Sequence, residues 1–159
     1  MKALSLRQPW CDAVLYGGKR IENRPKWTNS HFRGRFLIHA AKGMTRAEYA
    51  EACLFMAERG IEWRPGPRDK LVHGAIVGAA TVVDVIMPNG ERYGRHTGQR
   101  EYWESRHPLA GNHWYMGGFA LVLEDVVAFP KAFPYKGALG FFDVDAAEII
   151  SLASGHASA

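Results

Sequence analysis

Cysteine is scarce in this sequence: Cys11 and Cys53 are the only two among 159 residues. Two thiols cannot build a disulfide framework or a four-thiolate zinc site, and no other spacing of His, Cys and carboxylate residues matches a metal-ligand set. No apolar run approaches the roughly 20 residues that span a bilayer. Residues 1–7 carry charge too early for a secretory signal. These absences predict a cytoplasmic protein with no metal, no cofactor and no membrane partner.

Two familiar catalytic motifs are also missing. No serine lies in the G-x-S-x-G pattern of a nucleophile elbow, so a serine nucleophile has no support in the sequence. The segment 17–19 (GGK) lacks the upstream glycine of a phosphate-binding loop and is followed by Arg20 instead of Ser or Thr. His39 lies inside an apolar segment, where a histidine is usually partly buried with its hydrogen bonds satisfied; it would titrate near neutral pH if it reached a pocket.

The length is that of one domain, since about 100–200 residues per domain is usual. Hydrophobic residues make up 47% of the chain and charged residues 23%, which is ordinary for a folded globular protein. The 8 Phe, 6 Tyr and 5 Trp residues are enough for a core, with several left for a ligand surface. We predict a single domain over 1–150 and a frayed tail over 151–159.

Positive charge is concentrated at the start of the chain. The whole sequence has a net charge of +4, but residues 1–42 hold nine basic residues against two acidic ones, a net charge of +7. The remaining residues have a net charge of −3. Aromatic residues are interleaved with these cations, as in surfaces that bind phosphates and stack bases. A solvated basic face whose aromatic rings point into the core would give the same pattern.

Hydrophobic periodicity and turn residues predict short strands interrupted by helices. Pro9 suits the first turn of a helix that Gly17 ends, and Thr45 with Glu48 forms the capping-box signature of a second helix. Gly78 allows a bend or bulge in the strongest strand. The predicted elements are strands at 3–6, 35–40, 74–86, 119–128 with a break near 124–125, and 140–144, helices at 9–17, 45–60 and 99–106, a crossing segment bounded by Pro130 and Pro134, and a C-terminal helix opening at Asp145.

This order of elements indicates the α+β class. Several short strands with bends, and helices inserted between them, favour a small mixed β-barrel flanked by two to four helices. A doubly wound sheet is disfavoured because strands and helices do not alternate regularly and no glycine-rich phosphate loop follows a strand.

The segment 19–24 (KRIENR) carries the most suggestive chemistry. If the segment is extended, Arg20, Glu22 and Arg24 share one face. If it turns, Lys19 and Glu22 can meet, and a lysine beside a carboxylate in a cleft can serve as a general base or a nucleophile. The alternative is a surface ion pair that only positions the chain, worth about 0–1 kcal/mol. Farther along, His113 and Trp114 offer rings that could stack a base, and turn chemistry beside a core tryptophan explains them equally well.

Three blocks of the sequence resemble the ASCH domain, named for activating signal cointegrator homology: 4–10 (LSLRQPW), 18–24 (GKRIENR) and 34–42 (GRFLIHAAK). The resemblance continues at 74–86 and 133–144 and implies a PUA-like β-barrel with a cleft beside the first helix. It also implies RNA or nucleic-acid binding, and some members are hydrolases or ribonucleases. In the amidohydrolase members that act on 4-acetylcytidine, a lysine, a threonine three residues later and a downstream glutamate carry the chemistry. Glu91, Glu101 and Glu104 are all candidates for that glutamate. Lys19 matches that lysine, whereas Glu22 stands at the threonine position.

The leading hypothesis is a nucleic-acid-binding module for RNA, another single-stranded nucleic acid or a modified nucleotide, bound in a basic cleft beside the barrel. The alternative is a hydrolase of RNA or of an acylated cytidine, with Lys19 and Glu22 as its catalytic residues. A protein–protein adaptor is the third reading. The predicted nucleic-acid-binding residues are Ser5, Arg7, Gln8, Trp10, Lys19, Arg24, Lys42, His113 and Trp114, with Glu22 as a further reader of a base edge.

Overall fold

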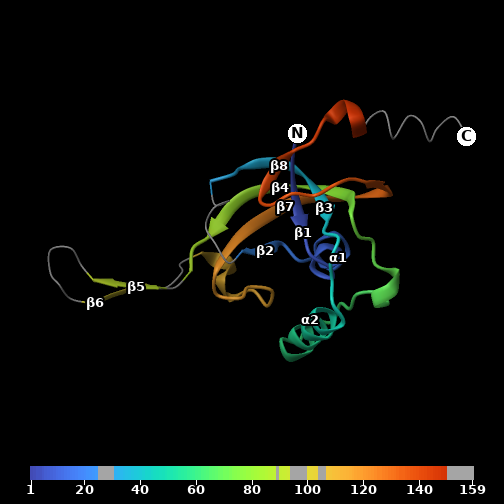
Figure 1. The fold of residues 1–159 in the computed structure, drawn as a ribbon. Helices are drawn as coiled ribbons and strands as arrows, with labels where there is room; N and C mark the ends of the chain where they lie inside the picture. The colour runs from blue at the N-terminus through green and yellow to red at the C-terminus, as the bar shows by residue number, and fades with distance from the viewer. Residues whose placement is uncertain (25–30, 89, 94–99, 104–106, 150–159) are drawn as a thin grey trace, which may run out of the picture.

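The centre of the fold is a curled six-stranded sheet (Figure 1). The computed structural model describes residues 1–24, 31–88, 90–93, 100–103 and 107–149. The strands follow the order β2-β7-β4-β3-β1-β8; β1 and β3 run parallel and the other neighbours antiparallel. This sheet confirms the predicted α+β class and the small mixed barrel. Its strands are β1 (Lys2–Leu6), β2 (Ile21–Arg24), β3 (Gly34–Ala40), β4 (Ala75–Ile86), β7 (Phe119–Pro134) and β8 (Phe141–Asp143).

The two longest strands, β4 and β7, bend together, and glycine makes one bend possible. A Cβ at Gly78 would lie 2.4 Å from the Val127 carbonyl oxygen and 2.7 Å from a methyl group of Leu15, far inside van der Waals contact. The pairing of β4 with β7 shifts register beside this residue, between Ile76 and Gly78. The bend predicted at Gly78 is therefore confirmed, and the close approach of a backbone carbonyl requires glycine there.

Strand β7 corrects two predictions. The chain does not break near 124–125 but continues as one strand, with a bulge at Asp125, whose φ of +50° lies in the left-handed region. Pro130 and Pro134 do not bound a separate crossing segment, because both lie within β7. Pro130 falls where the register shift leaves β7 without a partner residue on β4, so its missing N–H costs no ladder hydrogen bond.

Helix α1 (Trp10–Tyr16) lies against the sheet and α2 (Arg46–Glu58) lies beyond it, and both helices begin and end as predicted (Figure 1). Glycine at position 18, with a φ of +72°, turns the chain after α1. The capping box of α2 is complete: Glu48 N–H donates to Thr45 Oγ1 at 3.1 Å, and Thr45 N–H donates to Glu48 Oε2 at 2.6 Å. Helix α1 buries Cys11 in the main core, and burial raises the pKa of this thiol well above its ordinary value.

The remaining elements are short. The 3₁₀ turns are η2 (Arg68–Lys70) and η3 (Pro108–Gly111), and residues 146–149 form the start of the predicted C-terminal helix, where Ala147 N–H donates to Asp145 Oδ1 at 2.8 Å. Strand β5 (Gly90–Tyr93) pairs with β6 (Arg100–Trp103) to one side of the main sheet (Figure 1). The helix predicted over 99–106 is therefore wrong at 100–103, because pairing with β5 outweighs local helix propensity. The predicted tail, 151–159, lies outside the described residues.

Candidate functional site

A lysine and a glutamate form a buried ion pair where α1 passes into β2. Lys19 follows the glycine turn after α1, and its backbone N–H donates to the Ala13 carbonyl oxygen at 3.1 Å, which tucks the side chain under the helix. Only 1% of the Lys19 side chain is exposed, and its Nζ lies 3.0 Å from Glu22 Oε2. The same ammonium donates to the Ile21 carbonyl oxygen and lies 5.8 Å from the ring centroid of Trp10. The ammonium thus has an anion, a carbonyl and an aromatic ring as partners.

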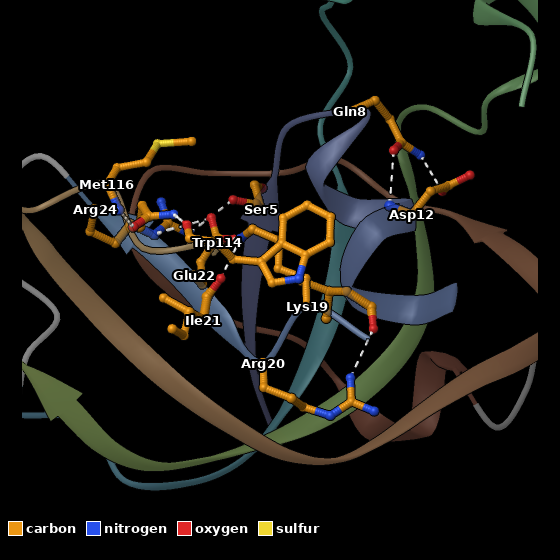
Figure 2. A network of polar contacts seen from close by, with 12 residues as sticks. Ser5, Gln8, Asp12, Lys19, Arg20, Ile21, Glu22, Arg24, Trp114 and Met116 are labelled. Carbon is orange, nitrogen blue, oxygen red and sulfur yellow. Dashed lines mark hydrogen bonds and ion pairs between the residues drawn. The ribbon is translucent and has the colours of Figure 1, made fainter. Parts of the chain in front are cut away.

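Arg24 extends this pair into a network that joins β2 to β1 (Figure 2). Arg24 Nε lies 3.8 Å from Glu22 Oε1, and Arg24 Nη2 donates to the Ser5 carbonyl oxygen at 3.1 Å. One carboxylate therefore lies between two cations. The bond to Ser5 links two strands that are not neighbours in the sheet order, so Arg24 helps to close the curled sheet.

The buried pair is closed in this conformation. The Lys19 ammonium is buried, with the Trp10 ring 5.8 Å away, so it is not open to a phosphate or a reacting group here. A lysine and a carboxylate at 3.0 Å can exchange a proton with a substrate, which is acid–base chemistry. The same contacts of Lys19 hold β2 against α1.

Trp10 lines one of two hollows at the end of β1. This Trp10 hollow has a volume of about 320 Å³ and lies between α1 and α2. Its charges are mixed, because Arg7 pairs with Glu48 at 2.6 Å and Glu51 also lines it. The Thr45 backbone N–H and the Arg7 guanidinium hold the pKa of Glu48 below its ordinary value, so this carboxylate stays charged. Trp10 itself packs edge-on against Phe55, with ring centroids 5.5 Å apart. The other lining residues are Gln8, Ala52 and Met116.

The second hollow is larger and carries only positive charge. This Lys42 hollow has a volume of about 1110 Å³ and lies where β1 and β3 end. Lys42 and Lys136 are exposed, His73 adds an imidazole, and none of the described residues that line it is acidic. Such a hollow attracts anions. Its other lining residues are Ser5, His39, Ala41, Gly74, Pro134, Tyr135, Gly137, Ala138 and Leu139.

The structure brings some of the predicted site residues together and separates others. Lys19, Glu22 and Arg24 form the buried network, with Trp10 beside it. Ser5 and Lys42 line the larger hollow, whereas Arg7, Gln8 and Trp10 line the smaller one. The predicted cations therefore do not gather in a single groove. The two hollows share no lining residue, but Ser5 of the larger one and Arg7 of the smaller one are two residues apart in the chain.

Three predicted residues are engaged within the fold. Gln8 Nε2 donates to Asp12 Oδ1 at 2.7 Å and to the Val72 carbonyl oxygen at 3.0 Å, so its amide anchors the start of α1. Trp114 is buried in the core beside α2, and its carbonyl accepts from Asn23. His113 Nδ1 lies 2.8 Å from the Arg59 carbonyl oxygen, and His113 lines neither hollow.

Sequence reasoning missed His73 and Lys136 and did not place His39 at a hollow. Lys136 lies within the block 133–144 that resembles the ASCH pattern, but nothing local connects it with Lys42, 94 positions earlier.

Within the described part of the chain no group of three His, Cys, Asp or Glu side chains could hold a metal ion. In the same residues, no helix is long and apolar enough to cross a membrane.

The ASCH domain family model matches residues 4–131, most of the chain. This protein belongs to the ASCH domain family. Members of the family are associated with nucleic-acid binding in general. Together with the curled sheet, membership confirms the PUA-like fold predicted for this ASCH domain.

Solved structures of the same family are similar to this chain. The crystal structure of ASCH from Zymomonas mobilis matches at 16% identity, with 96% of this chain and 93% of that chain covered and a TM-score of 0.47. A tyrosine-to-phenylalanine mutant and a serine-to-alanine mutant of the same Zymomonas protein match at 16% identity over 96% of this chain, both with a TM-score of 0.42, and 96% and 94% of their own chains are covered. No curated protein matches the sequence.

Proposed function

We propose that this ASCH domain binds single-stranded RNA in the cytoplasm, with the RNA phosphates in the Lys42 hollow. The observation that carries the proposal is the charge of that hollow: two exposed ammonium groups and an imidazole line it, and no carboxylate does among the described lining residues. Lysines that neutralise phosphates release condensed counterions, which favours binding at low salt.

The Trp10 hollow suits a base better than a phosphate. The two carboxylates of Glu48 and Glu51 disfavour a phosphate there, whereas the indole of Trp10 provides a face for stacking. Because Ser5 lines one hollow and Arg7 the other, a single strand that crosses the end of β1 would present a phosphate to Lys42 and a neighbouring base to Trp10. RNA in place of DNA, and one strand in place of two, are part of the proposal.

The test is a salt titration of RNA binding. Fluorescence anisotropy of a labelled single-stranded RNA should give an affinity that falls as salt rises. Lys42→Ala and Lys136→Ala should each remove one ammonium from a phosphate, so the slope of log K against log salt should become shallower by about 0.7 in each variant. Lys2→Ala is the matched control, because it removes one lysine at the opposite end of β1. A salt-independent affinity, or an equal change in Lys2→Ala, would refute binding through the Lys42 hollow.

A second candidate function, hydrolysis, is favoured by one observation: the buried Lys19–Glu22 pair lies beside Trp10, at the margin of the smaller hollow. The reaction would cleave RNA or an acylated cytidine after Trp10 moves aside. Incubation with labelled RNA and with 4-acetylcytidine tests it. Turnover should be absent in Lys19→Met and retained in Lys2→Met; turnover that survives Lys19→Met, with the fold intact by circular dichroism, removes Lys19 from the mechanism.

A further inference from the structure

Ser5 and His39 form a hydrogen-bonded pair whose proton positions follow from the geometry. His39 Nε2 lies 2.8 Å from the Tyr135 carbonyl oxygen, and His39 Nδ1 lies 2.9 Å from Ser5 Oγ. A carbonyl oxygen can only accept a hydrogen bond, so Nε2 must carry a proton. In the neutral ring Nδ1 is then unprotonated and accepts the Ser5 hydroxyl proton, since the Ala138 carbonyl oxygen is farther from Oγ, at 3.5 Å. The Tyr135 carbonyl thus fixes the tautomer in which His39 acts as a base toward Ser5.

The pair is held rigidly and lines the Lys42 hollow. Ser5 on β1 lies opposite His39 on β3 in the parallel register of the two strands, so the backbone fixes their spacing. His39 is 2% exposed, whereas Ser5 is only partly buried. Gly137 passes close by: a Cβ there would lie 2.5 Å from His39 Cε1 and 2.8 Å from Ser5 Oγ. Glycine leaves the hydroxyl unobstructed by a side chain at this position.

From this arrangement the geometry points to Ser5 as the nucleophile of an ester-hydrolysing site, with His39 as its base. A hydroxyl, a base within hydrogen-bond reach and a third group that orients the base are the features of an activated serine. The orienting group here is a carbonyl dipole, which stabilises an imidazolium less than a carboxylate would. Esters, whose leaving alcohol needs less assistance than an amine, are therefore the matching substrates. Lys42 and Lys136 favour an ester that carries a negative charge.

The reaction balances without a metal or a redox partner. Ser5 Oγ forms a bond to the ester carbonyl carbon while its proton passes to His39 Nδ1. The carbon–oxygen bond to the alcohol then breaks, and the alcohol leaves with the proton from His39. Water attacks the acyl-serine in the same way, giving its proton to His39, and Ser5 recovers it as the carboxylic acid departs. The net change is ester plus water to acid plus alcohol.

Covalent labelling tests the proposal separately from RNA binding. A fluorophosphonate probe on the folded protein, followed by intact-mass analysis and peptide mapping, should modify Ser5 and leave Ser5→Ala unmodified. His39→Gln should lower the labelling rate at least tenfold, and Lys2→Ala should not change it. Hydrolysis of 4-nitrophenyl acetate and of an anionic ester, 4-nitrophenyl succinate, should follow the same order, with Lys42→Ala lowering the ratio of the anionic to the neutral rate.

Two results would overturn the assignment. One is labelling of Ser5 no faster than that of a surface serine in the same peptide map; the other is an unchanged rate in His39→Gln. Circular dichroism must show each variant folded, and if His39→Gln fails to fold, Gly137→Ala gives the second measurement. Its added methyl group crowds Ser5 Oγ, so labelling should fall; labelling at the wild-type rate in folded Gly137→Ala would also count against an accessible nucleophile. Wild-type protein that binds RNA with the expected salt dependence but is not labelled at Ser5 would refute the ester-hydrolysing site and leave the RNA-binding proposal standing.

Discussion

Replacing Glu22 should destabilise the fold more than replacing Lys19, because one buried carboxylate serves two cations. Glu22→Gln keeps the shape of the side chain and an oxygen that can accept from Lys19, but it removes the negative charge between Lys19 and Arg24. Lys19→Met removes one cation and leaves Glu22 with Arg24, whose Nε lies 3.8 Å from Glu22 Oε1. The two single variants therefore differ in how much uncompensated charge they leave buried.

The expected losses in free energy of unfolding follow from how deeply the two side chains are buried. The Lys19 side chain is 1% exposed and that of Glu22 is 9% exposed. Breaking a buried pair by removing one partner costs about 3–5 kcal/mol, so we expect that range for Glu22→Gln. For Lys19→Met we expect about 1–3 kcal/mol, the cost of leaving the Ile21 carbonyl and one carboxylate oxygen without a donor. For a domain of this size, the Glu22→Gln loss corresponds to a fall in Tm of roughly 6–20 °C.

Urea unfolding of the two single variants and of the double variant measures these losses in free energy of unfolding. Lys19→Met/Glu22→Gln should be more stable than Glu22→Gln alone, since it removes a cation that the single variant leaves buried. Asp143→Asn is the matched control: it breaks the Lys2–Asp143 pair, which has the same 3.0 Å separation but exposed side chains, and should cost about 0–1 kcal/mol. A loss in Lys19→Met as large as that in Glu22→Gln, or strict additivity in the double variant, would refute the shared-carboxylate argument.

Three further predictions concern other parts of the fold. Gly78→Ala should lower the free energy of unfolding by about 1–3 kcal/mol, because its Cβ would meet the Val127 carbonyl. Gly43→Ala should not show that loss in the same urea titration, because the nearest atom to its Cβ is Arg7 Nη2 at 3.9 Å. The pKa of Glu48 is lowered in the folded protein, so its contribution to stability is present above its ordinary pKa of 4.5 and is lost as pH falls through the lower folded value. The difference in free energy of unfolding between wild type and Glu48→Gln should therefore shrink across that acid range. A difference that does not change with pH would contradict this linkage. The buried Cys11, whose pKa is raised, should resist a thiol reagent until urea unfolds the protein, and rapid reaction of Cys11 at neutral pH would mean that α1 opens locally.

Local chemistry explains which elements could be predicted from the sequence. The capping box at Thr45 acts within one helical turn, and the glycines after α1 act within one turn of chain, so both helix boundaries follow from neighbouring residues. The β-branched run of β4 likewise predicts its own strand. Strand β6 and the continuous β7 were mispredicted, because their pairing partners lie elsewhere in the chain and set the conformation of these segments.

The candidate site also has features that local sequence predicts and features that it does not. The sequence alone predicted a contact between Lys19 and Glu22 only if the segment after the glycines turned, and it left an extended segment equally open; in the structure Ile21–Arg24 is a strand and the pair still forms. Only the tertiary structure decided that the pair is buried beside Trp10, that Lys42 and Lys136 share one hollow, and that Ser5 faces His39. These contacts join residues 9 to 94 positions apart in the chain. Strand order and register bring such residues together. The strand order and register depend on the pairing energy of the whole sheet, so no single position in the sequence reveals them.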